Sequence, residues 1–178
     1  MRFVETPLAG AFVLEPEKHH DERGFFANVW TVEELSAHGL NRSWAQSSIS
    51  FNERAGTLRG MHFQIAPHAE TKLVTCTAGA VFDVIVDLRA ESPTRLRWFG
   101  VELTASNNLT CYIPEGFAHG FLTLQDDSVV QYHMSAPQHV ASATGVRWDD
   151  PAFDIEWPGV PAVMNPRDRK YPDFEAVS

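Results

Sequence analysis

The sequence has few of the features that mark several common protein classes. Only two cysteines, Cys76 and Cys111, occur among 178 residues, too few for a small domain held together by disulfides. No apolar run approaches the roughly 18 residues that a membrane-spanning helix needs. The first residues (MRFVETP) lack the apolar stretch of a secretion signal. These absences predict a cytoplasmic protein with no membrane partner.

Positive charge is also scarce. Lys and Arg number 14 against 23 Asp and Glu, which gives a net charge of −9 at pH 7. A general nucleic-acid binder would normally present a basic surface, so no nucleic-acid partner is expected. Core-forming residues are abundant, with 44% hydrophobic residues that include 12 Phe and 5 Trp. This composition predicts one folded domain over residues 1–178.

Short apolar runs with period-2 alternation dominate the middle of the chain. They lie at residues 72–77, 80–89, 98–103, 110–113, 121–124 and 128–134. Their spacing, about 8–12 residues between turn signals, is typical of a β-sandwich or barrel. Thr31 and Glu34 form a capping box that predicts one short helix, which Gly39 would end. The prediction is an all-β protein with short peripheral helices, wrapped by the Pro- and Trp-rich chain after Val146.

A histidine motif points to a more specific fold. Residues 113–121 (IPEGFAHGF) resemble the second motif of the cupin double-stranded β-helix, a jelly roll. The first cupin motif normally contains His-x-His, but the comparable place here reads His62-Phe63-Gln64. His62, His119 and Glu70 would therefore make a poor three-ligand metal site. A metal-dependent cupin oxygenase is one interpretation, and histidines that only form hydrogen bonds inside the barrel are another.

Five motifs in a fixed order extend the resemblance over most of the chain. They are residues 21–26 (DERGFF), 58–64 (LRGMHFQ), 72–74 (KLV), 82–89 (FDVIVDLR) and 114–121 (PEGFAHGF). Together they resemble the dTDP-4-dehydrorhamnose 3,5-epimerase family from about Phe12 to Asp168. The resemblance implies a cupin-type barrel without metal or organic cofactor, and a homodimer that exchanges N-terminal strands. It implies epimerisation at C3, C5 or both of a nucleoside-diphosphate-linked 4-keto-6-deoxyhexose, in rhamnose-like deoxysugar biosynthesis.

The implied catalytic residues fit this chemistry. A proton on a carbon next to a ketone can be removed when a base lies beside it and the enolate oxygen is stabilised. The resemblance makes His62 the base, and imidazole suits that role because its ordinary pKa lies near neutrality. It also makes Asp168 the carboxylate that orients this histidine. Tyr132 is then the proton donor on the opposite face of the sugar.

Lys72 is expected to stabilise the enolate oxygen. It is one of three lysines and the only one that opens an apolar, strand-like run. Burying an unpaired charge is costly, so a lysine in this place needs a reason. Strand parity puts it on the same face as Val74 and Cys76, which should point into the barrel. The alternative is a lysine that protects an exposed edge strand from aggregation.

Substrate contacts are implied by the same resemblance. Guanidinium groups bind phosphate oxygens in bidentate fashion, and a chain of net charge −9 needs a local positive cluster to hold a diphosphate. The implied contacts to the diphosphate and sugar are Arg23, Arg59, Arg167 and His119. Phe26 is expected to stack on the nucleobase, and Gln46 and Ser48 are expected to contact the nucleotide. Asp83 is expected to support the catalytic histidine from behind.

Several positions depart from the family pattern. They are Asn28, Ser48, Ile49, Gln138 and Ala143. Because they fall among the implied nucleotide contacts, the nucleobase of the substrate stays open. A single-position epimerase that acts on a nucleotide sugar other than a dTDP-sugar, and a sugar-binding jelly roll without catalysis, are the remaining alternatives.

Overall fold

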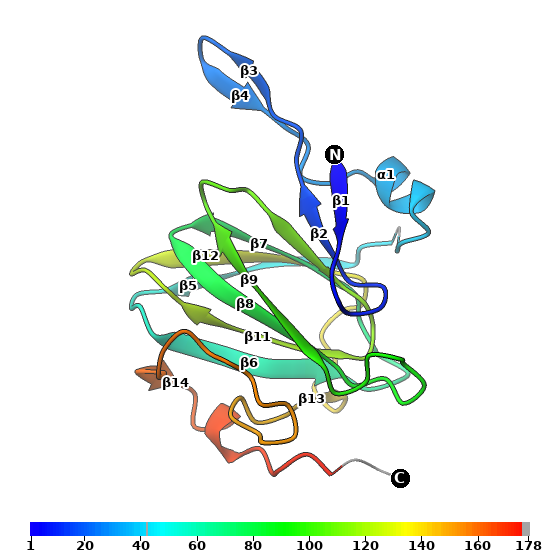
Figure 1. Ribbon diagram of the computed structural model, residues 1–178, viewed down its shortest axis with the longest axis vertical. Coiled ribbons are helices and arrows are strands. Elements are labelled where there is room, and N and C mark those ends of the chain that lie inside the picture. The colour runs from blue at the N-terminus through cyan, green and yellow to red at the C-terminus, as the bar shows by residue number, and fades with distance from the viewer. Residues whose placement is uncertain (42, 176–178) are drawn as a thin grey trace.

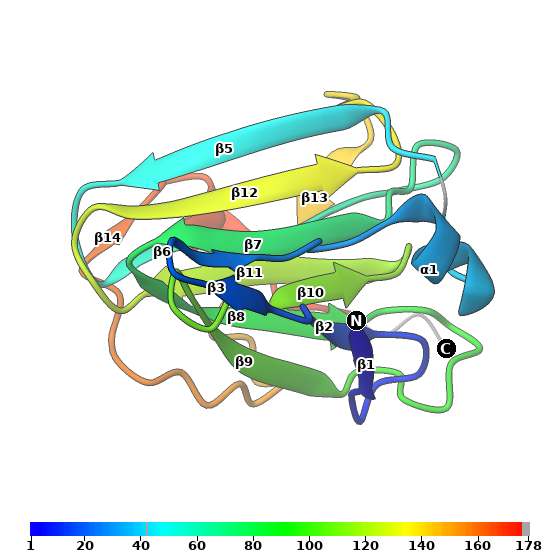
Figure 2. The same cartoon turned by 90° about the horizontal axis from the view of Figure 1, so that it is seen from above.

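The computed structural model describes residues 1–41 and 43–175, and strands dominate it. Two antiparallel sheets face each other (Figure 1). The first has the order β1 (Arg2–Glu5), β2 (Phe12–Glu15), β10 (Thr110–Ile113), β7 (Lys72–Ala78), β12 (Ser128–Met134) and β5 (Gln46–Asn52), seen from above in Figure 2. The second has the order β13 (Ala143–Gly145), β6 (Thr57–Gln64), β11 (Phe117–Thr123), β8 (Ala80–Asp87) and β9 (Trp98–Thr104). The all-β prediction is confirmed, and facing sheets are what a cupin-type jelly roll requires.

The main core lies between the two sheets. Val74 and Cys76 from β7 pack there against Ile85 from β8 and Phe121 from β11, and all four side chains are buried. Because side chains alternate along a strand, the same parity carries Lys72 to the inner face. The structure buries Lys72, as the sequence predicted.

A second apolar layer covers the outer face of β8. Val84 packs there beside Phe82 and against Trp157 of the chain that follows Val146. That chain includes β14 (Val163–Met164), which pairs with β6 in parallel, and the short 3₁₀ turn η1 (Asp168–Lys170). The alternation in β8 predicted a strand but not its facing. Asp83 lies on the face that points into the barrel, and the apolar residues on either side of it face outward.

The helix prediction is confirmed. Helix α1 (Val32–Ala37) follows Thr31, whose hydroxyl accepts a hydrogen bond from the Glu34 backbone N–H at 3.1 Å. Gly39 follows the helix with φ of +68°. A capping box is a local signal, which explains why the sequence alone located this element.

Some strands differ from the prediction. β11 begins at Phe117 rather than at residue 121, so His119 lies inside the strand instead of at its start. The small residues Ala118 and Gly120 interrupt the alternation that marks a strand. Strands β5 and β6 were missed. The run QSSISFN of β5 alternates, but its only apolar residues, Ile49 and Phe51, are exposed, and the run LRGMHFQ of β6 lacks the alternation.

The N-terminal region has two parts. β1 and β2 pair with each other and with β10 of the same chain. The hairpin of β3 (His19–Asp21) and β4 (Gly24–Phe26) stands away from the two sheets (Figure 1). The Phe25 and Phe26 side chains on this hairpin are exposed.

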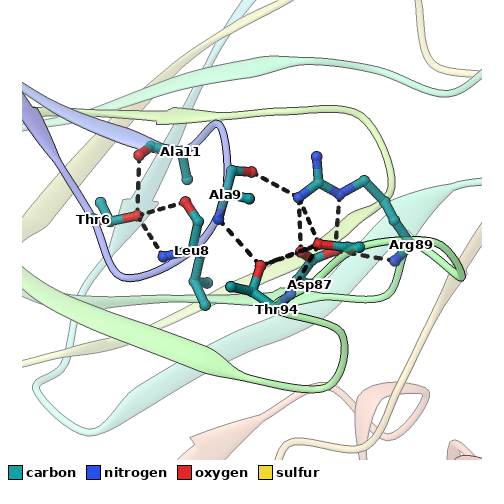
Figure 3. Close-up of polar contacts among 8 residues, drawn as sticks. Thr6, Leu8, Ala9, Ala11, Asp87, Arg89 and Thr94 are labelled. Carbon is teal, nitrogen blue, oxygen red and sulfur yellow. Dashed lines mark hydrogen bonds and ion pairs between the residues drawn. The ribbon is translucent and has the colours of Figure 1, made fainter.

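A buried carboxylate fastens the β1–β2 turn to the barrel (Figure 3). Asp87 accepts hydrogen bonds from Arg89 Nε at 2.9 Å and from Thr94 Oγ1 at 2.7 Å. Ser92 Oγ also donates to it. Arg89 donates further to the carbonyl oxygen of Ala9 at 2.7 Å, so one network joins the end of β8 to the N-terminal turn.

The hydrogen bonds of Asp87 should make the free energy of unfolding depend on pH. Burial alone would raise the pKa of Asp87, but hydrogen bonds from Arg89, Ser92 and Thr94 lower it from 3.8 to about 2. A carboxylate with a lowered pKa stabilises the fold above its ordinary pKa, and this contribution, about 2 kcal/mol, is lost as the pH falls toward 2. Asp87→Asn is expected to lower the free energy of unfolding at pH 7 by about 2–4 kcal/mol.

Urea denaturation at a series of pH values measures this effect. The variant should also show a flatter loss of stability between about pH 4 and 2 than the native chain. Asp149→Asn is the matched control, because Asp149 forms a more exposed pair with Arg147 and should contribute less than about 1 kcal/mol. Native stability in Asp87→Asn would refute the account of the network.

Candidate active site

A cavity of about 750 Å³ opens between the two sheets. Strands of both sheets line it, together with β14 and the η1 turn. Its walls contain most of the site residues predicted from the sequence: His62, Tyr132, Asp168, Lys72, Gln46, Ser48, Arg59, His119 and Arg167. The structure therefore brings together residues that lie far apart along the chain.

His62 and Asp168 form a hydrogen-bonded pair in the cavity wall. Nε2 of the imidazole lies 2.8 Å from Oδ1 of the carboxylate, and Asp168 is 3% exposed. Burial alone would raise the pKa of Asp168, but the hydrogen bond and charge of His62 lower it below its usual value. A carboxylate accepts the Nε2 proton, so Nδ1 of His62 keeps its lone pair. The pair thus presents a base.

Close backbone contact between β6 and β11 places two imidazoles side by side. His62 and His119 are direct partners across these strands. Two residues before His62, Gly60 has φ of +141°, and a Cβ at this position would lie 2.5 Å from Cα of Gly120. Only glycine fits such a conformation at such a distance.

Asp83 supports the other histidine. Its Oδ1 lies 2.7 Å from Nε2 of His119, and both side chains are buried. The sequence-based expectation that Asp83 lies behind the catalytic histidine, His62, is wrong. Asp83 lies on β8, which pairs with the strand of His119 and not with the strand of His62.

Tyr132 approaches the cavity from the opposite sheet. Its hydroxyl lies 3.2 Å from Oγ of Ser50 on β5, and its ring stands edge-on to that of His119. Burial raises the pKa of Tyr132, although the hydrogen bond with Ser50 acts in the other direction. The phenol therefore stays protonated at neutral pH and can act as a proton donor.

Lys72 is held by two groups. Its Nζ lies 3.1 Å from Oε1 of Glu70 and donates to the backbone oxygen of His62 at 3.4 Å. Oε2 of Glu70 in turn accepts a hydrogen bond from Gln64 at 2.9 Å. β7 lies between β10 and β12, so the alternative of an edge-strand lysine is wrong. Lys72 is among the residues that line the cavity.

Three side chains that contact the site were missed by the sequence analysis. Ser50 was not predicted, Gln64 was named only as the residue in place of a second metal-binding histidine, and Glu70 only as a metal ligand. Gln64 could have been found, because it follows His62 by two residues and so shares its strand face. Glu70 lies in a segment without a strand-like pattern. Ser50 lies in a short alternating run whose apolar residues face outward, so no apolar signal marked the face that it shares.

The metal site considered from the sequence is not formed. His62, His119 and Glu70 each pair with a different neighbour, as described above. Among residues 1–41 and 43–175, no three or more His, Cys, Asp or Glu side chains are grouped so that they could hold a metal ion. The geometry of these donors gives no support to the oxygenase interpretation.

Two arginines lie at the rim of the cavity. Arg59 donates from Nε to Oδ1 of Asn52 at 2.7 Å, and its Nη2 donates to the backbone oxygen of Phe51 at 3.2 Å. Arg167 is 61% exposed, and its Nε lies 3.7 Å from Oδ1 of Asp168. Together they place positive charge where an anionic group of a ligand would enter.

Two predicted substrate contacts lie elsewhere. Arg23 and Phe26 belong to the projecting β3–β4 hairpin (Figure 1). Arg23 pairs with Asp21, from Nε to Oδ2 at 3.1 Å, and the Phe26 side chain is 70% exposed. The structure does not bring either residue to the cavity of its own chain.

The departures from the family pattern divide into two groups. Ser48, Gln138 and Ala143 line the cavity. Ile49 lies on the other face of β5, where it is 71% exposed, and Asn28 is exposed between β4 and α1. Only the first group can touch a ligand in the cavity of this chain.

Comparisons with known proteins agree with this geometry. Residues 5–176 match the family model for dTDP-4-dehydrorhamnose 3,5-epimerase. An enzyme of that name from Sinorhizobium fredii is 39% identical over 175 residues, which are 98% of this chain and 90% of that protein. Another from Methanothermobacter thermautotrophicus is 43% identical over 157 residues, 88% of this chain and 84% of that one.

Solved structures are similar over almost the whole chain. A dTDP-4-dehydrorhamnose 3,5-epimerase from Bacillus anthracis, with TDP and PPi bound, has a TM-score of 0.93 and 39% identity, and covers 97% of this chain and 99% of its own. A 3′-monoepimerase from Streptomyces bikiniensis in complex with dTDP-quinovose has a TM-score of 0.88 and 32% identity, and covers 96% of this chain and 86% of its own. In the described part of this chain, no helix is both long and apolar enough to pass through a lipid bilayer.

Proposed function

The chain belongs to the dTDP-4-dehydrorhamnose 3,5-epimerase family and is a sugar epimerase of deoxysugar biosynthesis, and we propose that His62 and Tyr132 carry its chemistry. The reaction inverts C3, C5 or both of a nucleotide-linked 4-keto-6-deoxyhexose. We also propose that the protein acts in the cytoplasm as a single domain, without metal or organic cofactor.

In the proposed mechanism, Nδ1 of His62 removes the proton from a carbon beside the ketone. The electron pair of the broken C–H bond moves to the ketone oxygen, which becomes an enolate oxygen next to the Lys72 ammonium. Asp168 holds the Nε2 proton of His62 and stabilises the imidazolium that forms. Tyr132 then donates its proton to the carbon from the opposite face, and both side chains regain their starting states by exchange with solvent.

One observation supports this proposal most strongly. His62 comes from β6 of one sheet, and Tyr132 comes from β12 of the sheet that faces it. Both line the same cavity. A base and an acid on opposite walls are what inversion at a planar enolate carbon requires.

The proposed substrate carries a dTDP group. Arg59 and Arg167 at the rim supply guanidinium groups suited to a diphosphate. The cavity volume, about 750 Å³, lies in the range usual for small-molecule sites. The relatives of known structure that bind TDP or dTDP-quinovose favour the same nucleotide. Polar Ser48 and Gln138 would then contact the nucleotide end.

A panel of dTDP-, CDP- and GDP-linked 4-keto-6-deoxyhexoses tests this assignment. Proton NMR monitors the turnover of each substrate and gives its kcat/KM. We expect turnover of the dTDP-sugar to exceed that of the others by at least about tenfold. Binding of every sugar without turnover would contradict the proposal and favour a sugar-binding jelly roll.

We further propose a homodimer in which the β3–β4 hairpin of one protomer completes the site of the other. The hairpin projects from the barrel and exposes Phe25 and Phe26. β5 is the edge strand of its sheet, and its outer face carries the exposed Ile49 and Phe51. A hairpin laid along this edge would cover these apolar groups and bring Arg23 to the cavity rim.

Phe26→Asp tests the dimer. We expect the variant to be monomeric by light scattering and to have a KM at least about tenfold higher, because a charge replaces an apolar contact. Val160→Asp is the control, since Val160 is 87% exposed and lies outside both surfaces. A native chain that is monomeric at working concentration and fully active would refute the proposal.

A further inference from the structure

Tyr171 contacts the catalytic pair from outside the cavity. Its ring stands edge-on to the His62 ring, with centroids 6.4 Å apart and planes at 69°. It also lies flush against the backbone of Gly145, where an added Cβ would come within 2.6 Å of Tyr171 Cε2 and Cζ. Gly145 is the partner of His62 across β13 and β6. The tyrosine thus packs on β13, which is the strand next to the one that carries the base.

The same ring belongs to the segment that carries Asp168. Tyr171 directly follows η1, a turn of only three residues. The backbone hydrogen bonds of this turn are local, from Asp168 to Asn165 and from Lys170 to Arg167. Such a turn has little rigidity of its own. The contact of Tyr171 with β13 attaches it to the barrel beside the carboxylate.

Tyr171 has no direct role in the proposed chemistry. Its side chain is half-buried and is not part of the cavity wall. The Arg167 guanidinium lies 6.0 Å from the ring centroid, on the side of the substrate rim. Burial raises the pKa of Tyr171, so the phenol stays neutral. The Tyr171 ring instead packs against His62 and Gly145, next to Arg167.

We propose that Tyr171 is a positioning residue that fixes the η1 turn on β13 and so holds Asp168 at 2.8 Å from His62. This inference rests on the proposed function only where its test measures kcat; the geometry of the His62–Asp168 pair can be tested without substrate. Outer groups that orient a functional histidine or its carboxylate commonly affect activity by about 10- to 100-fold. The ring, and not the hydroxyl, makes the contacts that carry this argument.

Three variants test the proposal. Tyr171→Ala should lower kcat for both deuterium exchange and epimerisation by about tenfold, with KM within about twofold of the native value. Tyr171→Phe keeps the ring and should restore native kcat. Phe174→Ala is the matched control, because Phe174 lies in the same segment but packs on Phe153. It should lower thermal stability and leave kcat unchanged.

A second readout needs no substrate. The Nε2 proton of His62, held by Asp168, should give a low-field proton NMR signal. The signal should broaden or vanish in Tyr171→Ala and persist in Tyr171→Phe and Phe174→Ala. An unchanged signal and kcat in Tyr171→Ala, equal losses in Tyr171→Phe, or an equal loss of kcat in Phe174→Ala would overturn the proposal. If the signal behaves as expected while the native chain shows no exchange, the positioning role stands and the proposed function fails.

Discussion

His62→Asn is expected to abolish both epimerisation and deuterium exchange at the carbons beside the ketone. The Asn amide is shorter than imidazole and does not reach Asp168, but the Gly60 backbone N–H still donates to that carboxylate at 3.4 Å, so the fold should persist. It has no group that accepts a proton near neutral pH, and the enolate therefore cannot form at a useful rate. The expected loss is about 10³-fold or more, measured by proton NMR in deuterated water.

Two further variants separate the role of His62 from general disturbance. Asp168→Asn should reduce the same step by about 10- to 100-fold, because it leaves the base in place but loosens its orientation. His133→Asn should leave the rate unchanged, since His133 packs against Trp30 outside the cavity. Exchange near the native rate in His62→Asn would show that another group is the base.

Tyr132→Phe is expected to separate exchange from inversion. The variant keeps the ring and its packing but loses the hydroxyl next to Ser50. The enolate should still form, because His62 and Lys72 remain, and its carbon should then be protonated from the original face. Deuterium should enter the sugar with its configuration retained, while inversion falls by about 10²–10⁴-fold.

Lys72→Ala should fail in a different way. The missing ammonium raises the barrier to the enolate that both outcomes share, so exchange and inversion should fall together. Proton NMR follows both through signal loss and coupling constants. Inversion at the native rate in Tyr132→Phe would assign the donor role to a water molecule or another residue.

Local signals in the sequence located individual elements well. The capping box of Thr31 and Glu34 placed α1, and the alternation beginning at Lys72 placed β7 and its inner face. Both depend on neighbours a few residues apart. β6 was not predicted as a strand, because glycine and catalytic side chains stand in place of the alternating apolar residues that would mark it.

Such local signals could not predict which side chains meet across the fold. His62 and Asp168 lie 106 positions apart, so the family resemblance, and not periodicity, predicted their contact. Asp83 was assigned to the wrong histidine because strand order decides which neighbour it meets. The ion pair between Glu70 and Lys72 and the packing of Tyr171 on Gly145 also depend on how the strands and loops are arranged in space.

Proton NMR of the native protein with a dTDP-linked 4-keto-6-deoxyhexose in deuterated water tests the central claim most directly. If His62 forms the enolate and Tyr132 protonates it, the product carries solvent deuterium at each inverted carbon, which is C3, C5 or both. Inversion that keeps the original hydrogen on carbon, or a sugar that binds without exchange at either carbon, would contradict it.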